Sequence, residues 1–191
     1  INSSYFCLNT AGQDGGVMGI TDADFVKISY SLLGKNSARN FGGSICLYSI
    51  RLIVMYYSKF YDNCAALDGG SIYLHITEIF VNSDLNFVNN TARSGGAIFG
   101  QNLQTLSFKG STFLYNRALS QNGGAVFIDG VLISFNFETV LENNSALSYG
   151  GAIYIKGKDK CLFFANKVKL ISNRADSGGG VYISFASNIS I

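Results

Sequence analysis

The stretch FVNNTARSGGAI, residues 87–98, decides the fold, because its pattern recurs along the whole chain. A large apolar residue is followed three positions later by Asn, and that Asn two positions later by Ala. A Gly-Gly pair, a small residue and an aliphatic residue complete the pattern. The Gly-Gly pairs begin at positions 15, 42, 69, 95, 123, 150 and 178, so the interval between successive pairs is nearly constant. Self-similarity at such a period is the signature of a repeat architecture.

All seven units carry the same columns of residues. The Asn that precedes Ala by two positions occurs at Asn9, Asn36, Asn63, Asn90, Asn116, Asn144 and Asn173. The apolar residue three positions before it is Phe6, Leu33, Phe60, Phe87, Phe113, Leu141 or Leu170. After each Gly-Gly the pattern alternates as in a β-strand, and the rest of each unit adds further short β segments. No part of the pattern is typical of a helix.

These features predict an all-β fold, a right-handed parallel β-helix (β solenoid) of about seven coils with about 27 residues per coil. One unit cannot bury its own apolar side and must stack on the next. We expect a single β-helix domain, residues 1–191, that is part of a longer chain or of a filament. The expected repeats are 6–32, 33–59, 60–86, 87–112, 113–140, 141–169 and 170–191.

Stacking assigns a physical task to each column. The seven Asn residues are expected to form a ladder in which each side-chain amide bonds to its neighbour, as in stacked cross-β structures. The Phe/Leu column fills the core, and Gly-Gly supplies positive φ or a close backbone approach. We interpret all three columns as scaffold and not as an active site.

Composition excludes several classes of protein. The chain has no Pro, so it contains no Pro-rich linker, and its 48% hydrophobic content is enough for a full core. A net charge of +2 does not indicate binding to nucleic acid. The longest apolar stretch, residues 45–57, contains Arg51 and is too short to cross a bilayer, so we expect no transmembrane segment. We interpret this stretch as buried strands.

The pairing of Phe-x-x-Asn with Gly-Gly-Ala-Ile resembles the repeat of the chlamydial polymorphic outer membrane proteins and related right-handed β-helix proteins. It is clearest in residues 87–98 and in residues 113–126. The resemblance covers nearly the whole chain. It implies a surface-exposed protein with a role in adhesion, located outside the cell or on its surface.

Right-handed β-helices also include pectin-type hydrolases and lyases, so an enzyme is the alternative. A glycosidase needs two carboxylates within about 5 to 10 Å. Asp14 and Asp68 precede Gly-Gly two coils apart, and Asp22 and Asp24 form a second acidic spot with Lys27 as the nearest base. We interpret all four as solvated turn carboxylates. We expect no catalytic residues, no cofactor and no metal site.

The remaining candidates are single residues. His75 is the only histidine, and we interpret it as a surface residue. The state of Cys7, Cys46, Cys64 and Cys161 stays open, because they lie in different columns and lack metal-binding spacing. Acceptor sequences for N-glycosylation begin at Asn2, Asn89, Asn143 and Asn188.

A stripe of aromatic residues gives the most specific hypothesis about the surface. The third residue after each Gly-Gly pair is aromatic in five successive coils, namely Tyr73, Phe99, Phe127, Tyr154 and Tyr182. We call these five residues the aromatic stripe. Monomers rarely expose such an area, so we expect a flanking loop, a neighbouring subunit or a glycan to cover it. The other interpretation is that this side turns inward as a second core layer.

The sequence therefore predicts a non-enzymatic extracellular module, structural or adhesive, that associates laterally or end to end. Its partners would be copies of itself or other surface proteins and glycans. A passive spacer that holds a binding domain away from a surface is a further alternative.

Overall fold

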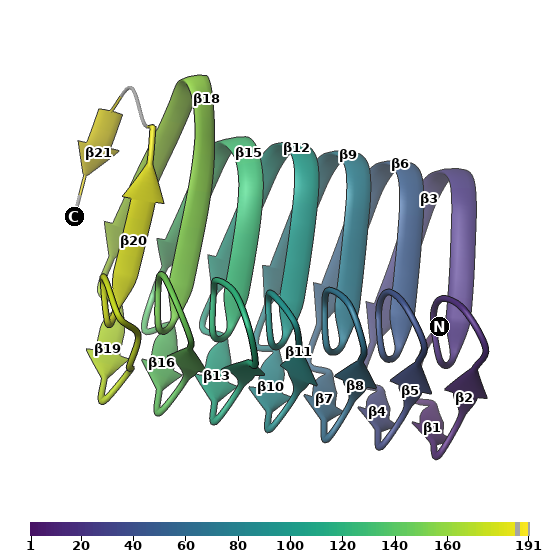
Figure 1. The fold of residues 1–191 in the computed structure, drawn as a ribbon. Coiled ribbons are helices and arrows are strands. Elements are labelled where there is room, and N and C mark those ends of the chain that lie inside the picture. The colour runs from purple at the N-terminus through teal and green to yellow at the C-terminus, as the bar shows by residue number, and fades with distance from the viewer. Residues whose placement is uncertain (186–187, 191) are drawn as a thin grey trace.

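The computed structural model describes residues 1–185 and 188–190, and the side chains of all of these except residues 158–160. The chain winds through seven coils stacked along one axis, with its two ends at opposite ends of the stack (Figure 1). The described residues form strands and turns and no helix. The predicted fold class is confirmed: the protein is a parallel β-solenoid of about seven turns, and each turn corresponds to one repeat of the sequence.

The largest sheet contains the long strand of each coil, which begins after Gly-Gly. Its strands are β3 (Met18–Ser29), β6 (Ile45–Tyr56), β9 (Ile72–Ser83), β12 (Ile98–Lys109), β15 (Val126–Asn136), β18 (Ile153–Asn166), β20 (Val181–Ser184) and β21 (Asn188–Ser190). Each long strand bends in its middle and returns toward the other end of the coil (Figure 1). The sequence predicted several short β segments in this part of each coil, whereas the structure has one long strand. The strand is continuous because its pairing with the adjacent coils continues on both sides of the bend.

Two smaller sheets complete the cross-section. The first contains β1 (Tyr5–Cys7), β4 (Leu32–Gly34), β7 (Lys59–Tyr61), β10 (Asn86–Val88), β13 (Thr112–Leu114), β16 (Val140–Glu142) and β19 (Lys169–Ile171). The second contains β2 (Thr10–Ala11), β5 (Ser37–Ala38), β8 (Cys64–Ala65), β11 (Thr91–Ala92), β14 (Arg117–Ala118) and β17 (Ser145–Ala146). All pairs are parallel, and equivalent residues of successive coils are partners, as in Phe60, Phe87 and Phe113.

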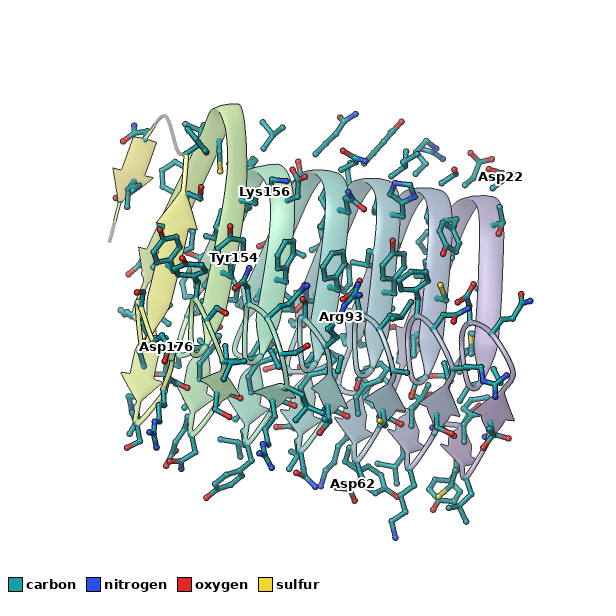
Figure 2. The ribbon with its side chains drawn as sticks, viewed as in Figure 1. Asp22, Asp62, Arg93, Tyr154, Lys156 and Asp176 are labelled. Carbon is teal, nitrogen blue, oxygen red and sulfur yellow. The ribbon has the colours of Figure 1, made fainter. Side chains whose placement is uncertain are left out.

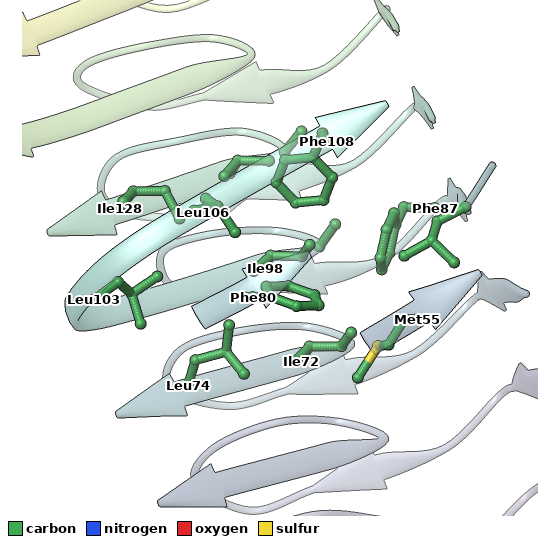
Figure 3. Packing of buried hydrophobic residues seen from close by; sticks show 14 of the residues in the cluster. Met55, Ile72, Leu74, Phe80, Phe87, Ile98, Leu103, Leu106, Phe108 and Ile128 are labelled. Atoms are coloured by element: carbon green, nitrogen blue, oxygen red, sulfur yellow. The ribbon is translucent and has the colours of Figure 1, made fainter. Parts of the chain in front are cut away.

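The core lies inside the coils and consists of stacked columns. Phe87 stacks between Phe60 and Phe113 with ring centroids 5.0 and 4.9 Å apart. Inward side chains from both halves of the long strands, such as Ile98 and Phe108, pack against this column (Figure 3). In the Phe/Leu column the five central members are fully buried, whereas Leu170 in the last coil is 44% exposed.

The two glycines of each pair serve different purposes, as Gly95 and Gly96 show. Gly95 has a φ of +59°, a left-handed conformation that glycine adopts without strain. At Gly96 a Cβ atom would collide with the backbone carbonyl of Gly124 in the next coil and with the backbone of Arg117. The pair therefore provides a tight corner and allows two coils to approach closely.

Candidate binding surfaces

The asparagine ladder runs through the interior of the solenoid at one corner of each coil. Each side-chain Nδ2 donates to the Oδ1 of the next Asn at 2.9 to 3.1 Å, which links Asn9, Asn36, Asn63, Asn90, Asn116, Asn144 and Asn173 in order. The same Oδ1 also accepts the backbone N–H of the preceding Asn at 2.9 to 3.0 Å.

Asn90 illustrates how completely the ladder uses its polar atoms. Its Nδ2 donates to Asn116 Oδ1 at 2.9 Å and to the carbonyl oxygen of Phe60 at 3.0 Å. Its Oδ1 accepts from the backbone and side-chain nitrogens of Asn63 at 3.0 and 3.1 Å. Because the side chain is fully buried and all four of these bonds are internal, the ladder holds the coils together and offers nothing to a ligand.

The aromatic stripe forms a continuous stack along the outside of the first half of the long strands. Its ring centroids are 5.4 Å apart for Tyr73 and Phe99, 4.4 Å for Phe99 and Phe127, 4.9 Å for Phe127 and Tyr154, and 5.8 Å for Tyr154 and Tyr182. Figure 2 shows Tyr154 on the near side of the solenoid, above the loops that lead to Gly-Gly.

The two ends of the stripe differ in how they are covered. Tyr73 is 6% exposed because Phe41, from the loop before Gly42, lies against it at 4.5 Å. The other four rings are partly exposed. Tyr149 lies against Tyr182 at 4.6 Å and is itself 41% exposed. A flanking loop of the chain therefore covers the start of the stripe, and the later rings keep contact with solvent.

Exposed leucines occupy the loops that precede Gly-Gly in two of the later coils. Leu119 and Leu147 occupy equivalent positions in successive coils, and each is 56% exposed. In an earlier coil the equivalent position is Arg93, which bonds to Asp68 at 3.0 Å (Figure 2 labels Arg93). We call Leu119, Leu147 and Tyr149 the leucine fringe. Tyr149 connects the fringe to the stripe, because its ring lies near those of Tyr154 and Tyr182. The position of the two leucines is Gly, Arg, Ala and Arg in the four earlier coils, so it is apolar and large only in these two later coils.

The carboxylates weighed as a glycosidase pair have structural partners. Asp14 Oδ1 accepts the backbone N–H of Phe41 at 3.2 Å, and Asp68 forms the ion pair with Arg93. Asp24 pairs with Arg51 of the next coil at 3.2 Å, so the expectation that Lys27 is its nearest base was wrong. Lys27 is nearer to Asp24 along the chain, but stacking brings Arg51 of the next coil beside it.

A shallow hollow of about 400 Å³ surrounds this ion pair and also contains Asp22 and Glu78. Asp22 lies at the bend of the long strand (Figure 2). Within residues 1–185 and 188–190 no three His, Cys, Asp or Glu side chains stand close enough together to hold a metal ion. In the same part of the chain no helix is long and apolar enough to cross a membrane.

His75 and the cysteines form no disulfide and no metal-binding cluster within the described residues. His75 is partly exposed, with its ring 5.8 Å from that of Tyr48 and its Nε2 3.3 Å from Asn102 Nδ2. All four cysteines are free thiols; Cys46 and Cys161 are buried, Cys7 is partly buried and Cys64 is exposed. Burial raises the pKa of the Cys46 thiol to about 12 and also raises the pKa of Cys161. Both buried thiols therefore stay protonated and inert at neutral pH.

The four glycosylation sequons are placed differently. Asn2, Asn89 and Asn188 are exposed, and Asn143 is partly buried. Asn89 and Asn143 share the corner position just before a ladder Asn, and both have left-handed φ values, +55° and +54°. Their amides already bond to carboxylates, since Asn89 donates to Asp62 at 2.7 Å and Asn143 to Glu142 at 3.3 Å.

Two supporting features were not anticipated from the sequence. The position before each ladder Asn is left-handed in all seven coils, even where it holds Leu8, Lys35 or Tyr115. In addition, Ser44 and Ser71 accept hydrogen bonds from the ladder amides of Asn36 and Asn63 at 3.3 and 3.2 Å. The repeat itself was the available signal for the serines, because both lie eight positions after a ladder Asn.

Comparison with known proteins identifies the repeat. Residues 84–101 and 138–156 match the family model of the Chlamydia polymorphic membrane protein repeat. Each matched segment begins just before the Phe/Leu residue and ends after Gly-Gly, so it contains the ladder corner and the start of a long strand. The match confirms the resemblance derived from the motifs in these two units. No curated protein and no solved structure matches the chain.

Proposed function

We propose that the chain is a non-enzymatic, structural or adhesive module of a cell surface, which acts through the outer faces of its solenoid. The observation that carries this proposal is the leucine fringe beside the partly exposed rings of the aromatic stripe. Contiguous apolar area of this kind is typical of a site that binds another macromolecule. A protein partner would bury the fringe and the later rings together.

The architecture supports a division between scaffold and binding surface. In the central coils the ladder and the Phe/Leu column are fully buried and do not depend on the outer side chains, so substitutions on the outside cost little stability. The regular coils therefore present a long outer surface, on which the residue types of the outward-facing columns can change without loss of the fold. The match of two units to a membrane protein repeat supports a location at the cell surface.

Adhesion can be measured with microspheres that carry the chain on their surface and are added to cultured epithelial cells. Replacing Leu119 and Leu147 by Ser should remove most of the bound microspheres, because both side chains would leave the interface. Leu8→Ser is the matched control, since Leu8 is 73% exposed and lies at a different corner. A passive spacer would show no adhesion above uncoated microspheres even for the unaltered chain, and that result would refute the adhesive role.

The enzyme alternative has weaker support, because Asp68 and Asp24 are each held by an arginine. It makes a clear prediction of its own. Release of reducing ends from polygalacturonate, abolished by Asp24→Asn or Asp68→Asn in a folded protein, would establish a carbohydrate-active enzyme in place of a binding module.

A further inference from the structure

The second half of each long strand forms a flat outer face that is separate from the aromatic stripe. Two columns of side chains point outward from it, as the pairing of the coils defines. The first column contains Phe25, Leu52, Ile79, Thr105, Leu132 and Leu162, and the second contains Lys27, Val54, Val81, Ser107, Ser134 and Phe164. We call these twelve residues the outer sheet face.

The outer sheet face is apolar although it faces solvent. Phe25 is 53% exposed, Ile79 40%, Val81 43% and Phe164 36%. A sheet that packs on a core with one side and meets water with the other alternates apolar and polar residues. Here the run Leu52-Ile53-Val54-Met55 is apolar on both sides, which is typical of a sheet that is covered on both faces.

Charged residues lie along the two edges of this face, with opposite signs. In the second halves of β3, β6, β9 and β12, the edge near the bend carries Asp24, Arg51 and Glu78. Toward the far edge the charged residues are Lys27, which is in the second column of the face, and Lys109, which lies beyond it. The near edge is therefore net acidic and the far edge basic. The face itself is polar only at Lys27, Thr105, Ser107 and Ser134.

We propose that a second copy of this chain docks on the outer sheet face, face to face, with the two solenoid axes parallel. The inference rests on the proposed function, because it specifies the face, the partner and the orientation of the lateral association. A twofold axis parallel to the solenoid brings the acidic edge of one copy opposite the basic edge of the other, so that Glu78 lies near the partner's Lys109. A twofold axis across the solenoid would place each edge opposite its own kind.

The size of the face fits a reversible dimer. Six coils at about 4.8 Å each give a length of about 29 Å. The six residues of each strand from one charged edge to the other, at about 3.3 Å each, give a width of about 20 Å and so an area of about 600 Å² per copy. The pair would bury about 1,200 Å², which is the lower limit for a specific protein interface. We therefore expect a dimer that dissociates in the micromolar range and whose strength depends on its central aliphatic residues.

Sedimentation equilibrium of the intact chain, between low and high micromolar concentration, tests the proposal. Val81→Lys should raise the dissociation constant at least about tenfold, because it places a charge in the apolar centre. Leu147→Lys, a change of the same kind in the leucine fringe, should leave it unaltered. Thermal unfolding followed by circular dichroism checks that each variant is folded.

Charge reversal at the edges tests the relative orientation of the two copies. It leaves the apolar centre of the interface unchanged. Glu78→Lys and Lys109→Glu should each weaken the dimer about threefold to tenfold, and the combined variant should recover most of the loss. Additive losses in the combined variant would overturn the parallel arrangement. A wild-type chain that stays monomeric at high concentration, or a Val81→Lys variant that dimerises as wild type does, would overturn the docking face itself.

The outcomes separate this inference from the proposed function. A dimer that Leu147→Lys breaks and Val81→Lys does not would refute the outer sheet face but keep lateral association. A monomeric chain that still adheres through the leucine fringe would refute self-association and keep adhesion. Loss of adhesion in all assays together with a Val81-dependent dimer would support this inference and refute the adhesive role.

Discussion

Asn90 and Asn82 are buried side chains only eight residues apart, but Asn90 has polar neighbours in its column and Asn82 has apolar ones. Asn90 stands in a column of seven equivalent asparagines and uses both ends of its amide in hydrogen bonds. Asn82 points into the apolar core between Met55 and Phe108 of the adjacent coils. Its Oδ1 accepts the hydroxyl of Ser111 at 3.3 Å, but its Nδ2 has no acceptor among the described residues.

The difference shows what a solenoid does with polar side chains. When every coil has the same polar residue at one position, each donor finds an acceptor one coil away, at the spacing that the backbone already imposes. A polar residue present in only one coil meets apolar neighbours and loses its hydration without gaining that bond. Burial of a polar group is therefore stabilising or costly in this fold according to whether its column is continuous.

The largest expected effect is at the centre of the ladder. Asn90→Ala removes four hydrogen bonds and leaves the Phe60 carbonyl and the Asn63 amide without these partners, so we expect a loss of about 3 to 5 kcal/mol in the free energy of unfolding. Urea denaturation measures it. The control is Asn86→Ala, an exposed Asn of the same coil, which should change stability by less than about 0.5 kcal/mol.

If both variants lose the same amount, the continuous column has no special role and the contrast with Asn82 fails. The measurement should be made at a low protein concentration, where the chain is monomeric, so that association does not contribute to the free energy.

The fold could be predicted from the sequence because every coil needs the same residue types at the same positions in order to stack on the next. Seven copies of Asn and Gly-Gly at one period specify both the ladder and the corner, and the chain pairs its coils in that register. The same period places Asp24 beside Arg51, one repeat further along the sequence, because stacking brings equivalent positions of adjacent coils together.

The outer surface was harder to predict for a physical reason. Residues such as Leu52 and Val54 alternate with inward Ile53 and Met55, so composition alone assigns the entire run to the core. Which side faces out depends on where the strand bends, and the bend at Ser49 or Ile76 uses a left-handed residue of no special type. The aromatic stripe was recognised because it repeats, whereas the outer sheet face mixes aliphatic, aromatic and polar residues.

Replacing the isolated Asn82 should stabilise the protein, whereas replacing the ladder residue Asn90 destabilises it. Asn82→Leu keeps the approximate shape of the side chain and removes the unpaired donor, so we expect unfolding to require about 1 to 2 kcal/mol more. Ser111 keeps its bond to the Lys109 carbonyl at 3.2 Å. The same substitution at Asn63 is the matched control and should destabilise by several kcal/mol, since Asn63 belongs to the ladder. A destabilised Asn82→Leu variant would mean that solvent satisfies the Asn82 amide.

The smallest expected effect concerns Thr77, which interrupts another inward column, between Ile50 and Leu103. Its side chain is 1% exposed, and its Oγ1 has no hydrogen-bond partner among the described residues. Thr77→Val replaces the hydroxyl by a methyl group of similar size, so we expect a gain of about 1 kcal/mol in the urea measurement. Thr105→Val makes the identical change on the outer sheet face of the next coil, where solvent reaches the hydroxyl, and should have almost no effect on the monomer. Equal responses at the two sites would show that burial of a lone hydroxyl carries no penalty here, and the explanation of the Asn82 effect by an unpaired donor would then lose its basis.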